Sequence, residues 1–456
     1  MQIRVEQTGQ GFALAIEGPA WRAAPCQIRF PTEVWQSFPD KEMLTNELAY
    51  ALTMVPPLLA DHPTVWYDTP EPVFFDFYND CFEQSIPNLV EPLAHENAED
   101  LLDRFRAVGR HFPAPPQPPV APLRTDWLPQ RVVVPFSFGK DSLLTIATLQ
   151  HSGYEVIPVL IDERVLPRGQ AHKEKLCHRL QQELNITCRH VVNEIQLLSD
   201  YQVLGHPETR LAQVHIHFVY LLAMLPFCFH YRAPLIAFNN EFHHSLNLVH
   251  RNGYLLPRKF MQSRTTTAAL GQMADRLSNS QVGVINLLGG LGDFAIHRLL
   301  HNRFPDYGDF RISCHLETTD QPRWCHKCHR CARAFLFFLA SGQDPFAHGF
   351  NHSMLSRDQQ GLFYLFAGQP RPEDSFRIFM QGEEQLAFSL ARQHGATGDL
   401  IDALQKTTPP LSAKARQQRH AQFLSLQAEP GPSEPEQQAA TLYSRWLSKD
   451  CREESE

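Results

Sequence analysis

The sequence has no long uninterrupted apolar run. Its most apolar helical stretch, 211–230, is interrupted by Gln213, His215 and His217, which favours a buried helix over a membrane span. Residues 1–5 also lack the charged and then apolar pattern of an export signal. Without such a signal, ten cysteines predict reduced thiols or metal ligands rather than disulfides. We therefore expect a cytoplasmic protein without a membrane partner.

The chain also has no excess of positive charge. Its 41 Lys and Arg residues stand against 49 Asp and Glu residues, which gives a formal net charge of −8. This balance argues against a broad electrostatic grip on nucleic acid, so we do not expect a nucleic-acid partner. The composition is that of a folded globular protein, with 43% apolar and 20% charged residues and no internal repeat. A length of 456 residues allows two or three domains.

Shifts in composition divide the chain into segments. A proline-dense stretch predicts a semi-rigid linker, and an acidic stretch rich in proline and glutamine predicts a flexible tail. The expected segments are an N-terminal α+β domain (1–111), the linker (112–123), an α/β domain (124–342), a helical region (343–427) and the tail (428–456).

Strand and helix signals alternate from residue 131 onward. Strands are predicted at 132–136, 155–161, 186–192, 234–238 and 282–287, with helical segments between them. The alternation predicts the α/β class, with a doubly wound parallel sheet covered by helices on both faces. Ligands in such folds bind at the carboxyl ends of the strands. The residues that fall at predicted ends are Asp162, Asn239, Asn240, Glu241 and the segment 289–292.

The first predicted strand of this region runs into a tight polar turn that opens a helix. Such a turn directs the free N–H groups and the positive end of the helix toward whatever lies above it, which favours an anion. Gly139 permits close backbone approach, Lys140 supplies charge, Asp141 can hold Mg2+ or shape the loop, and Ser142 can cap the helix or bind phosphate. Neither the Walker spacing nor the three-glycine dinucleotide pattern is present. The alternative is a plain turn between strand and helix.

The segment Ser137, Phe138, Gly139, Lys140, Asp141, Ser142 resembles the Ser-Gly-Gly-x-Asp-Ser motif of the PP-loop ATP pyrophosphatases, with Phe138 where glycine is usual. The resemblance implies an adenine nucleotide alpha-hydrolase-like fold for 124–342, with ATP and Mg2+ as cofactors. It also implies that Ser137, Gly139, Lys140, Asp141 and Ser142, together with Asp162 at the next strand end, bind the nucleotide.

Four cysteines form a candidate metal knuckle at 314–331. Cys325, Cys328 and Cys331 follow a Cys-x-x-Cys-x-x-Cys pattern, and Cys314 precedes them by eleven positions. Four thiolates can close a tetrahedral site, so Zn2+ is the first choice, with an iron–sulfur cluster as the alternative. Polar residues between the cysteines argue against a buried apolar stripe. We expect the neighbouring His315, His326 and His329 to be bystanders, although any of them could replace a cysteine.

PP-loop enzymes with a cysteine knuckle include the 7-cyano-7-deazaguanine synthases, to which the chain is similar. It more closely resembles the UDP-N-acetylmuramoyl-L-alanyl-L-glutamate epimerase family. The resemblance covers roughly residues 130–390, with a weaker echo in the N-terminal segment. It rests on the stretch from Arg323 through the cysteines to 334–340, on the segments 238–241 and 262–264, on 288–296 with Asp293 in place of glutamate, and on 382–384.

This second resemblance implies that ATP adenylates the terminal glutamate carboxylate of a UDP-MurNAc-dipeptide and releases pyrophosphate. The activated Cα then loses and regains its proton, and hydrolysis gives AMP and the D-epimer. An acyl adenylate spreads the negative charge that develops when Cα–H is deprotonated, so no pyridoxal cofactor is needed. Glu241, His243 and His244 are the candidate bases, with ordinary polar loop residues as the alternative. Arg264 could bind phosphate or carboxylate, and Asp293 could bind Mg2+ or cap its helix.

Three other functions compete with epimerisation. A ligase of the deazaguanine-synthase type would pass the adenylated carboxylate to ammonia, an amine or a protein, so a protein partner or protein substrate is possible. A tRNA-thiolating enzyme could use Cys177, Cys188 or Cys228, but the acidic net charge weakens this hypothesis. A degenerate loop marked by Phe138 would instead belong to a partner-binding scaffold.

Overall fold

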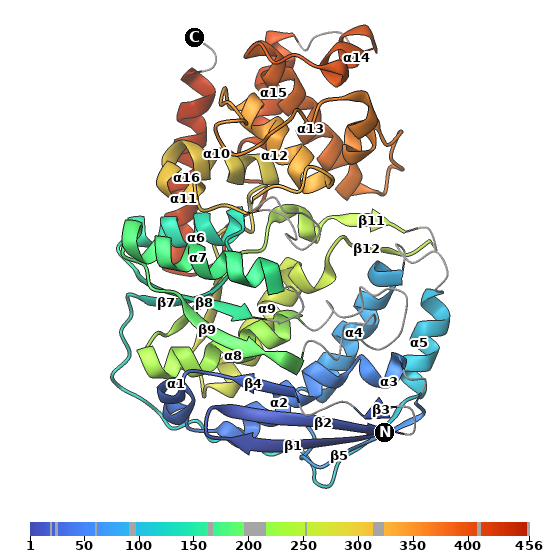
Figure 1. The fold of residues 1–456 in the computed structure, drawn as a ribbon, viewed down its shortest axis with the longest axis vertical. Coiled ribbons are helices and arrows are strands. Elements are labelled where there is room, and N and C mark those ends of the chain that lie inside the picture. The colour runs from blue at the N-terminus through green and yellow to red at the C-terminus, as the bar shows by residue number, and fades with distance from the viewer. Residues whose placement is uncertain are drawn as a thin grey trace.

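The computed structural model describes residues 1–18, 21–22, 26–59, 62–90, 97–162, 167–195, 216–250, 253–312, 323–407 and 412–453. One large sheet runs through the molecule, with helices packed against it (Figure 1). Its strands follow the order β13-β10-β7-β8-β9-β4-β2-β1-β5-β6, and β3 (Trp21–Arg22) pairs with β2. The predicted mixed α/β class is confirmed.

The strands predicted from the alternation form the parallel half of this sheet. They are β7 (Arg131–Phe136), β8 (Glu155–Asp162), β9 (Arg189–Asn193), β10 (Leu235–Phe238) and β13 (Gly283–Asn286). The chain moves outward from β7 to β8 and β9, then returns past β7 to β10 and β13. The direction of winding therefore reverses between β7 and β10, where open α/β sheets have a ligand-binding crevice.

The two faces of the parallel half contribute to two different cores. Val133 lies in the core that contains side chains of α8 and α9, whereas Val132 and Val134 lie in the core that contains side chains of α6, α7, α10 and α12. This follows from the two-residue period of a strand. The helices concerned are α8 (Ile216–Tyr231) and α9 (Arg264–Leu277) on one face, and α6 (Lys140–His151), α7 (Pro167–Leu184), α10 (Asp293–Arg303) and α12 (His329–Ala340) on the other.

The strands of segment 1–111 continue the same sheet. β4 pairs antiparallel with β9, so that Ile28 lies opposite Asn193 and Arg29 opposite Val192. The strands are β1 (Gln2–Thr8), β2 (Gly11–Gly18), β4 (Cys26–Arg29), β5 (Thr64–Tyr67) and β6 (Gly109–His111). The helices are α1 (Thr32–Ser37), α2 (Lys41–Thr53), α3 (Pro56–Leu59), α4 (Phe75–Val90) and α5 (Ala98–Ala107). The division of the chain into domains stays a prediction.

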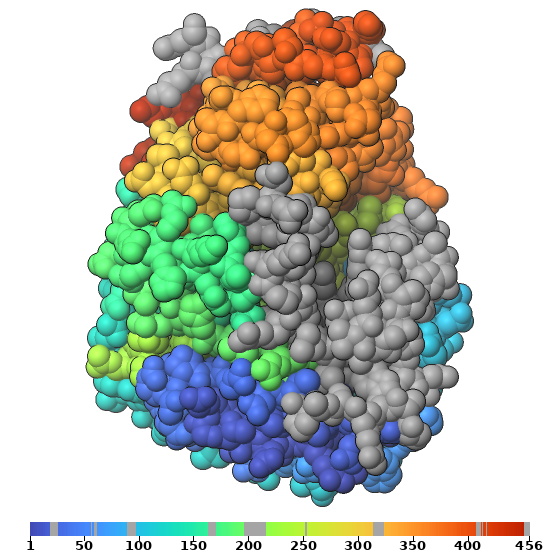
Figure 2. Space-filling view, viewed as in Figure 1, coloured from blue at the N-terminus to red at the C-terminus, as the bar shows by residue number. Residues whose placement is uncertain are grey.

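The C-terminal helices stack at the end of the molecule opposite β1 and β2 (Figures 1 and 2). They are α13 (Ser375–Gln393), α14 (Asp399–Thr407) and α15 (Ala413–Phe423). The shorter elements are the hairpin β11 (Asn247–Val249) and β12 (Leu255–Pro257), α11 (Pro305–Gly308), and the 3-10 turns η3 (Phe242–Ser245), η4 (Phe260–Gln262), η6 (Arg357–Leu362) and η7 (Tyr364–Phe366).

The expectation of a flexible tail at 428–456 is wrong for α16 (Glu434–Glu453). Ala439, Tyr443 and Leu447 recur every four residues and are buried in the core on the α6 face of the sheet. The Tyr443 hydroxyl also donates a hydrogen bond to Thr148 Oγ1 at 2.9 Å. This apolar stripe stabilises a helix whose first turn has the polar composition of a linker.

Residues 216–230 of the apolar stretch predicted at 211–230 form a buried helix, as expected, and 211–215 lie outside the described residues. Twelve side chains of α8 are buried, among them that of His217. Within the described ranges, no helix combines the length and the apolarity that crossing a membrane requires.

Candidate functional site

The turn after β7 folds back on itself through its serine side chains. Ser137 N–H donates to Ser142 Oγ at 3.4 Å, Gly139 N–H donates to Ser137 Oγ at 3.4 Å, and the Ser142 hydroxyl donates to Gly139 O at 3.2 Å. Gly139 is the N-cap residue of α6, and Lys140 is the first residue of that helix. The turn therefore lies over the N-terminal end of α6, at the point where the sheet reverses its winding.

Phe138 has the backbone conformation that glycine adopts most easily. Its φ angle is 60°, in the left-handed region, which costs a residue with a side chain about 1–2 kcal/mol. The side chain is fully buried, and its ring centroid lies 4.4 Å from that of Phe136. Phe138 O also accepts a hydrogen bond from Ile312 N–H at 2.9 Å. Burial of the Phe138 ring and the hydrogen bond from Ile312 stabilise this backbone conformation. A glycine would adopt the conformation without such support.

Lys140 does not extend into solvent but lies 8% exposed among three carboxylates. Its Nζ atom is 2.5 Å from Asp141 Oδ1, 2.9 Å from Glu241 Oε1 and 2.9 Å from Asp293 Oδ1. Burial alone would lower the pKa of Lys140, but the three carboxylates outweigh it and raise that pKa overall. These residues come from the starts of α6 and α10 and from the end of β10, so the topology brings them together.

Arg333 on α12 is a second buried cation next to the first. Its guanidinium lies 3.1 Å from Asp293 Oδ2 and 3.4 Å from Glu384 Oε1, and it forms a short ion pair with Glu383. Burial raises the pKa of Glu383 to about 8 and that of Glu384 to about 7, although Arg333 opposes both shifts. We call the whole set the charge cluster, which comprises Lys140, Asp141, Glu241, Asp293, Arg333, Glu383 and Glu384.

Burial has different effects on the two aspartates of the charge cluster. The pKa of Asp141 rises to about 6 because burial and the neighbouring Glu241 both disfavour its charged form. For Asp293, burial is outweighed by Lys140 and Arg333, which together bring its pKa well below the ordinary value. Of the two aspartates, Asp293 is therefore the one whose ionised form the charge cluster favours.

Two imidazoles lie beside the charge cluster. His243 Nδ1 is 3.4 Å from Glu241 Oε2, and His244 Nε2 is 4.0 Å from Glu241 Oε1. Burial lowers the pKa of His243 to about 3, and burial and His243 lower that of His244 well below its ordinary value. Both rings are therefore neutral at pH 7. Burial, with Arg330 and Arg258, also lowers the pKa of the nearby Lys259 to about 8.

Three of the four predicted knuckle cysteines lie together. The sulfur atoms of Cys325, Cys328 and Cys331 are all within 4.8 Å of one another, and those of Cys325 and Cys331 are 3.6 Å apart. These three cysteines, the thiol cluster, could bind a zinc ion. Cys314 and His315 lie outside the described residues.

The backbone of the thiol cluster folds to suit a metal turn. His326, between the first two cysteines, has a φ angle of 58°, which reverses the chain there. The ring of His326 accepts a hydrogen bond from Asn351 N–H at 3.3 Å. His329 is the first residue of α12, directly after Cys328. The thiol cluster thus begins the helix that carries Arg333 into the charge cluster.

Two predicted site residues lie away from the charge cluster. Arg264 is exposed, and its guanidinium donates to Glu429 O at 2.9 Å. Asp162 is buried at the end of β8, on the other side of β7 from β10. Sequence reasoning missed Arg333, whose signal is an arginine in the otherwise apolar run 331–340, and it assigned no role to Glu383 and Glu384.

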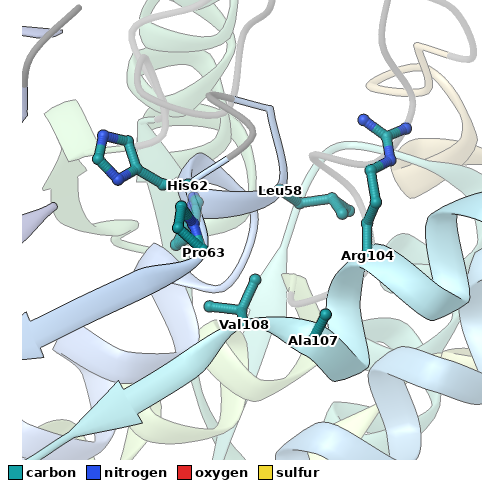
Figure 3. A pocket seen from close by; sticks show the side chains of 7 residues that line it. Leu58, His62, Pro63, Arg104, Ala107 and Val108 are labelled. Carbon is teal, nitrogen blue, oxygen red and sulfur yellow. The ribbon is translucent and has the colours of Figure 1, made fainter.

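A small pocket elsewhere in the molecule has no relation to this site. Figure 3 shows it between the end of α3 and the end of α5, with a cavity volume of about 120 Å³. Sites for small molecules are usually about 300–1,000 Å³, so this pocket is too small to hold a substrate. Its lining residues are Pro57, Leu58, His62, Pro63, Arg104, Ala107 and Val108.

Comparisons with known proteins add no support to the family resemblance, which rests on the sequence motifs alone. No family model matches the chain. No curated protein matches it significantly either.

Proposed function

We propose that the protein is an ATP-dependent enzyme of the PP-loop class that adenylates a carboxylate. The supporting observation is the turn at 137–142. It lies over the start of α6, where the sheet reverses its winding, and it contains the buried Lys140. A helix N-terminus with adjacent serine hydroxyls and a lysine is suited to bind a polyphosphate.

Adenylation breaks the bond between the α- and β-phosphates and forms a bond from a substrate carboxylate oxygen to the α-phosphorus. Pyrophosphate leaves with the electron pair of the broken bond. Mg2+ prefers hard oxygen ligands, and Asp141 and Asp293, on either side of Lys140, are the residues that fit it. When bound, Mg2+ would offset the phosphate charge.

The substrate that best fits the resemblance is a UDP-MurNAc-dipeptide or a similar peptide with a terminal glutamate. Adenylation makes the Cα–H of that glutamate acidic, because the acyl group can take up the charge left when the proton departs. Glu241, His243, His244 and Lys259 are the groups on this side of the turn that can interact with the activated acyl group or its proton. Return of the proton to the opposite face, followed by hydrolysis, releases AMP and the epimer.

Incubation with ATP, Mg2+ and UDP-MurNAc-L-Ala-L-Glu in deuterated water tests this function. We expect AMP, pyrophosphate and one deuterium at the glutamate Cα, detected by mass spectrometry and proton NMR. Lys140→Ala should abolish AMP formation, whereas Lys175→Ala, at an exposed lysine of α7, should leave it unchanged. A product whose mass differs from that of the substrate by anything other than this exchange would favour the ligase alternative. Absence of both AMP formation and ATP binding would refute adenylation.

A further inference from the structure

Glu241, His243 and His244 form a compact group of potential metal ligands, which we call the imidazole group. Each residue offers one ligand atom that lies within 4.8 Å of the other two. All three residues are more than nine-tenths buried, with exposures of 7%, 8% and 6%. Both histidines belong to the short turn η3, which begins immediately after Glu241 in the sequence.

Several polar atoms of this group have no hydrogen-bond partner. Among the described residues, Glu241 Oε2, His243 Nδ1 and His244 Nδ1 are buried and accept or donate no hydrogen bond. A buried polar atom left unsatisfied usually costs about 1–3 kcal/mol, so three in adjacent side chains need an explanation. Each of these atoms can present a lone pair, and a single cation can interact with several lone pairs at once.

The charges around the imidazole group also favour a cation. In the charge cluster, Lys140 and Arg333 contact five carboxylates, and Glu241 belongs to both sets. Two cations thus face five carboxylates, and a further cation would stabilise the ionised forms of those carboxylates that burial disfavours. A surplus of buried negative charge is unfavourable unless a cation offsets it.

We propose that the imidazole group binds a divalent transition-metal ion. Two imidazoles and one carboxylate suit Fe2+, Mn2+, Co2+ or Zn2+ rather than Mg2+ or Ca2+, which prefer oxygen ligands. This site is separate from the thiol cluster, because its ligands follow β10 whereas the thiols precede and begin α12.

Three protein ligands leave open coordination positions, as in catalytic metal sites. Such an ion can polarise a carbonyl oxygen and stabilise the negative charge that forms on it. If the proposed adenylation holds, the activated acyl group of the substrate is the natural ligand for an open position. Metal binding itself does not depend on that function, and it can be measured without ATP or substrate.

Cobalt titration of the zinc-loaded full-length chain tests the site. The protein is first loaded with one equivalent of Zn2+, which the thiol cluster takes up, and excess metal is removed. Co2+ is then added and followed by visible absorption and calorimetry. We expect one further equivalent, with d–d bands but no thiolate-to-cobalt charge-transfer band. Mg2+ in excess should not displace it.

His243→Ala and His244→Gln each remove one ligand. Changing a residue that merely hydrogen-bonds to a metal ligand typically weakens metal binding at least about tenfold, so each variant should weaken Co2+ binding by more than that. His394→Ala, at an exposed histidine, is the matched control and should bind like wild type. Zinc retained at the thiol cluster shows that each variant is folded.

Three results would overturn the proposal. These are no Co2+ uptake by the zinc-loaded wild type, unchanged uptake by both histidine variants, or a thiolate charge-transfer band from the added cobalt. Co2+ uptake without AMP formation would refute only the proposed adenylation, and AMP formation without Co2+ uptake would refute only the metal site.

Discussion

Two buried glutamates, Glu47 and Glu241, differ in how completely their carboxylate oxygens are hydrogen-bonded. Glu47 on α2 is completely buried, and both of its oxygens accept hydrogen bonds. Val73 N–H donates to Oε1 at 2.5 Å, and the Tyr78 hydroxyl donates to Oε2 at 2.7 Å. Glu241 has one oxygen paired with Lys140, while its other oxygen has no hydrogen bond among the described residues.

The difference indicates what each carboxylate contributes. A fully hydrogen-bonded buried carboxylate ties local segments together, in this case α2 and the start of α4. A buried carboxylate with an unsatisfied oxygen lowers stability. Such groups are found most often at functional sites, where a bound ligand supplies the missing partner. Glu47 therefore fits a structural role, whereas the unsatisfied oxygen of Glu241 fits the metal binding that we propose. The following predictions test this contrast.

Removing Arg333 should have the largest effect on stability. Arg333→Met leaves Glu383 and Glu384 buried without their cation and Asp293 with Lys140 alone, which should lower the free energy of unfolding by about 3–5 kcal/mol. Urea unfolding followed by circular dichroism at pH 7 measures the change. Arg179→Met removes an exposed ion pair on α7 and should cost less than about 0.5 kcal/mol. Equal losses in the two variants would contradict a buried charge cluster.

Glu47 should make the free energy of unfolding depend on pH. Burial is the largest influence on Glu47 and raises its pKa from 4.5 to about 7, so the folded state holds this proton more tightly than the unfolded state. The free energy of unfolding of the wild type should therefore fall as the pH rises from 4.5 to 7. Relative to Glu47→Gln, which cannot ionise, the loss should be on the order of 2–3 kcal/mol.

Urea unfolding at pH 5 and pH 8 tests the pH effect of Glu47. The difference between wild type and Glu47→Gln should shift in favour of the variant at pH 8. Glu33→Gln, at an exposed position on α1, is the control and should follow the wild type at both values. A constant difference between wild type and Glu47→Gln would show that Glu47 does not titrate in this range.

The hydroxyl that supports Glu47 should have a smaller effect. Tyr78→Phe removes the 2.7 Å hydrogen bond to Glu47 Oε2 and should cost about 1 kcal/mol at pH 5. In a double-mutant cycle, the same substitution should cost less in the Glu47→Gln background, where the original hydrogen bond has already been altered. An unchanged cost in that background would mean that the hydroxyl stabilises the fold by another contact.

The imidazole group should contribute least to stability. His244→Leu replaces a buried ring with an unsatisfied nitrogen by an apolar side chain of similar size, so it should change stability by less than about 0.5 kcal/mol in chelator. In the zinc-loaded chain, Co2+ at 100 times its dissociation constant should stabilise the wild type by about 2.7 kcal/mol and leave the variant unchanged. Thermal unfolding with and without Co2+ measures both effects. A large loss in chelator would make His244 a structural residue.

Much of the parallel half of the sheet could be predicted from sequence, because each strand and helix there carries its own local pattern. Every strand predicted from residue 132 to 287 is present with small changes at its ends. The candidate residues Glu241 and Asp293 meet Lys140 because parallel strands end at the same edge of a sheet.

The remaining features depend on contacts between distant parts of the chain. The antiparallel pairing of β4 with β9 joins residues about 165 positions apart, and no local pattern specifies such a partner. Arg333 and Glu383 look like ordinary charged helix residues until packing buries them together. The left-handed backbone of Phe138 could not be predicted either, because its side chain argues for the opposite conformation.

Helix α12 has a consequence for the conditions under which this protein can work. Cys331 and Arg333 are two residues apart on one helix, so the thiols and the guanidinium move as one rigid body. We expect oxidation of the thiols to disturb the start of α12 and, through that helix, the ion pairs of Arg333 with Asp293 and Glu383. A reducing environment should therefore favour the charge cluster, because it keeps the thiols at the start of α12 reduced.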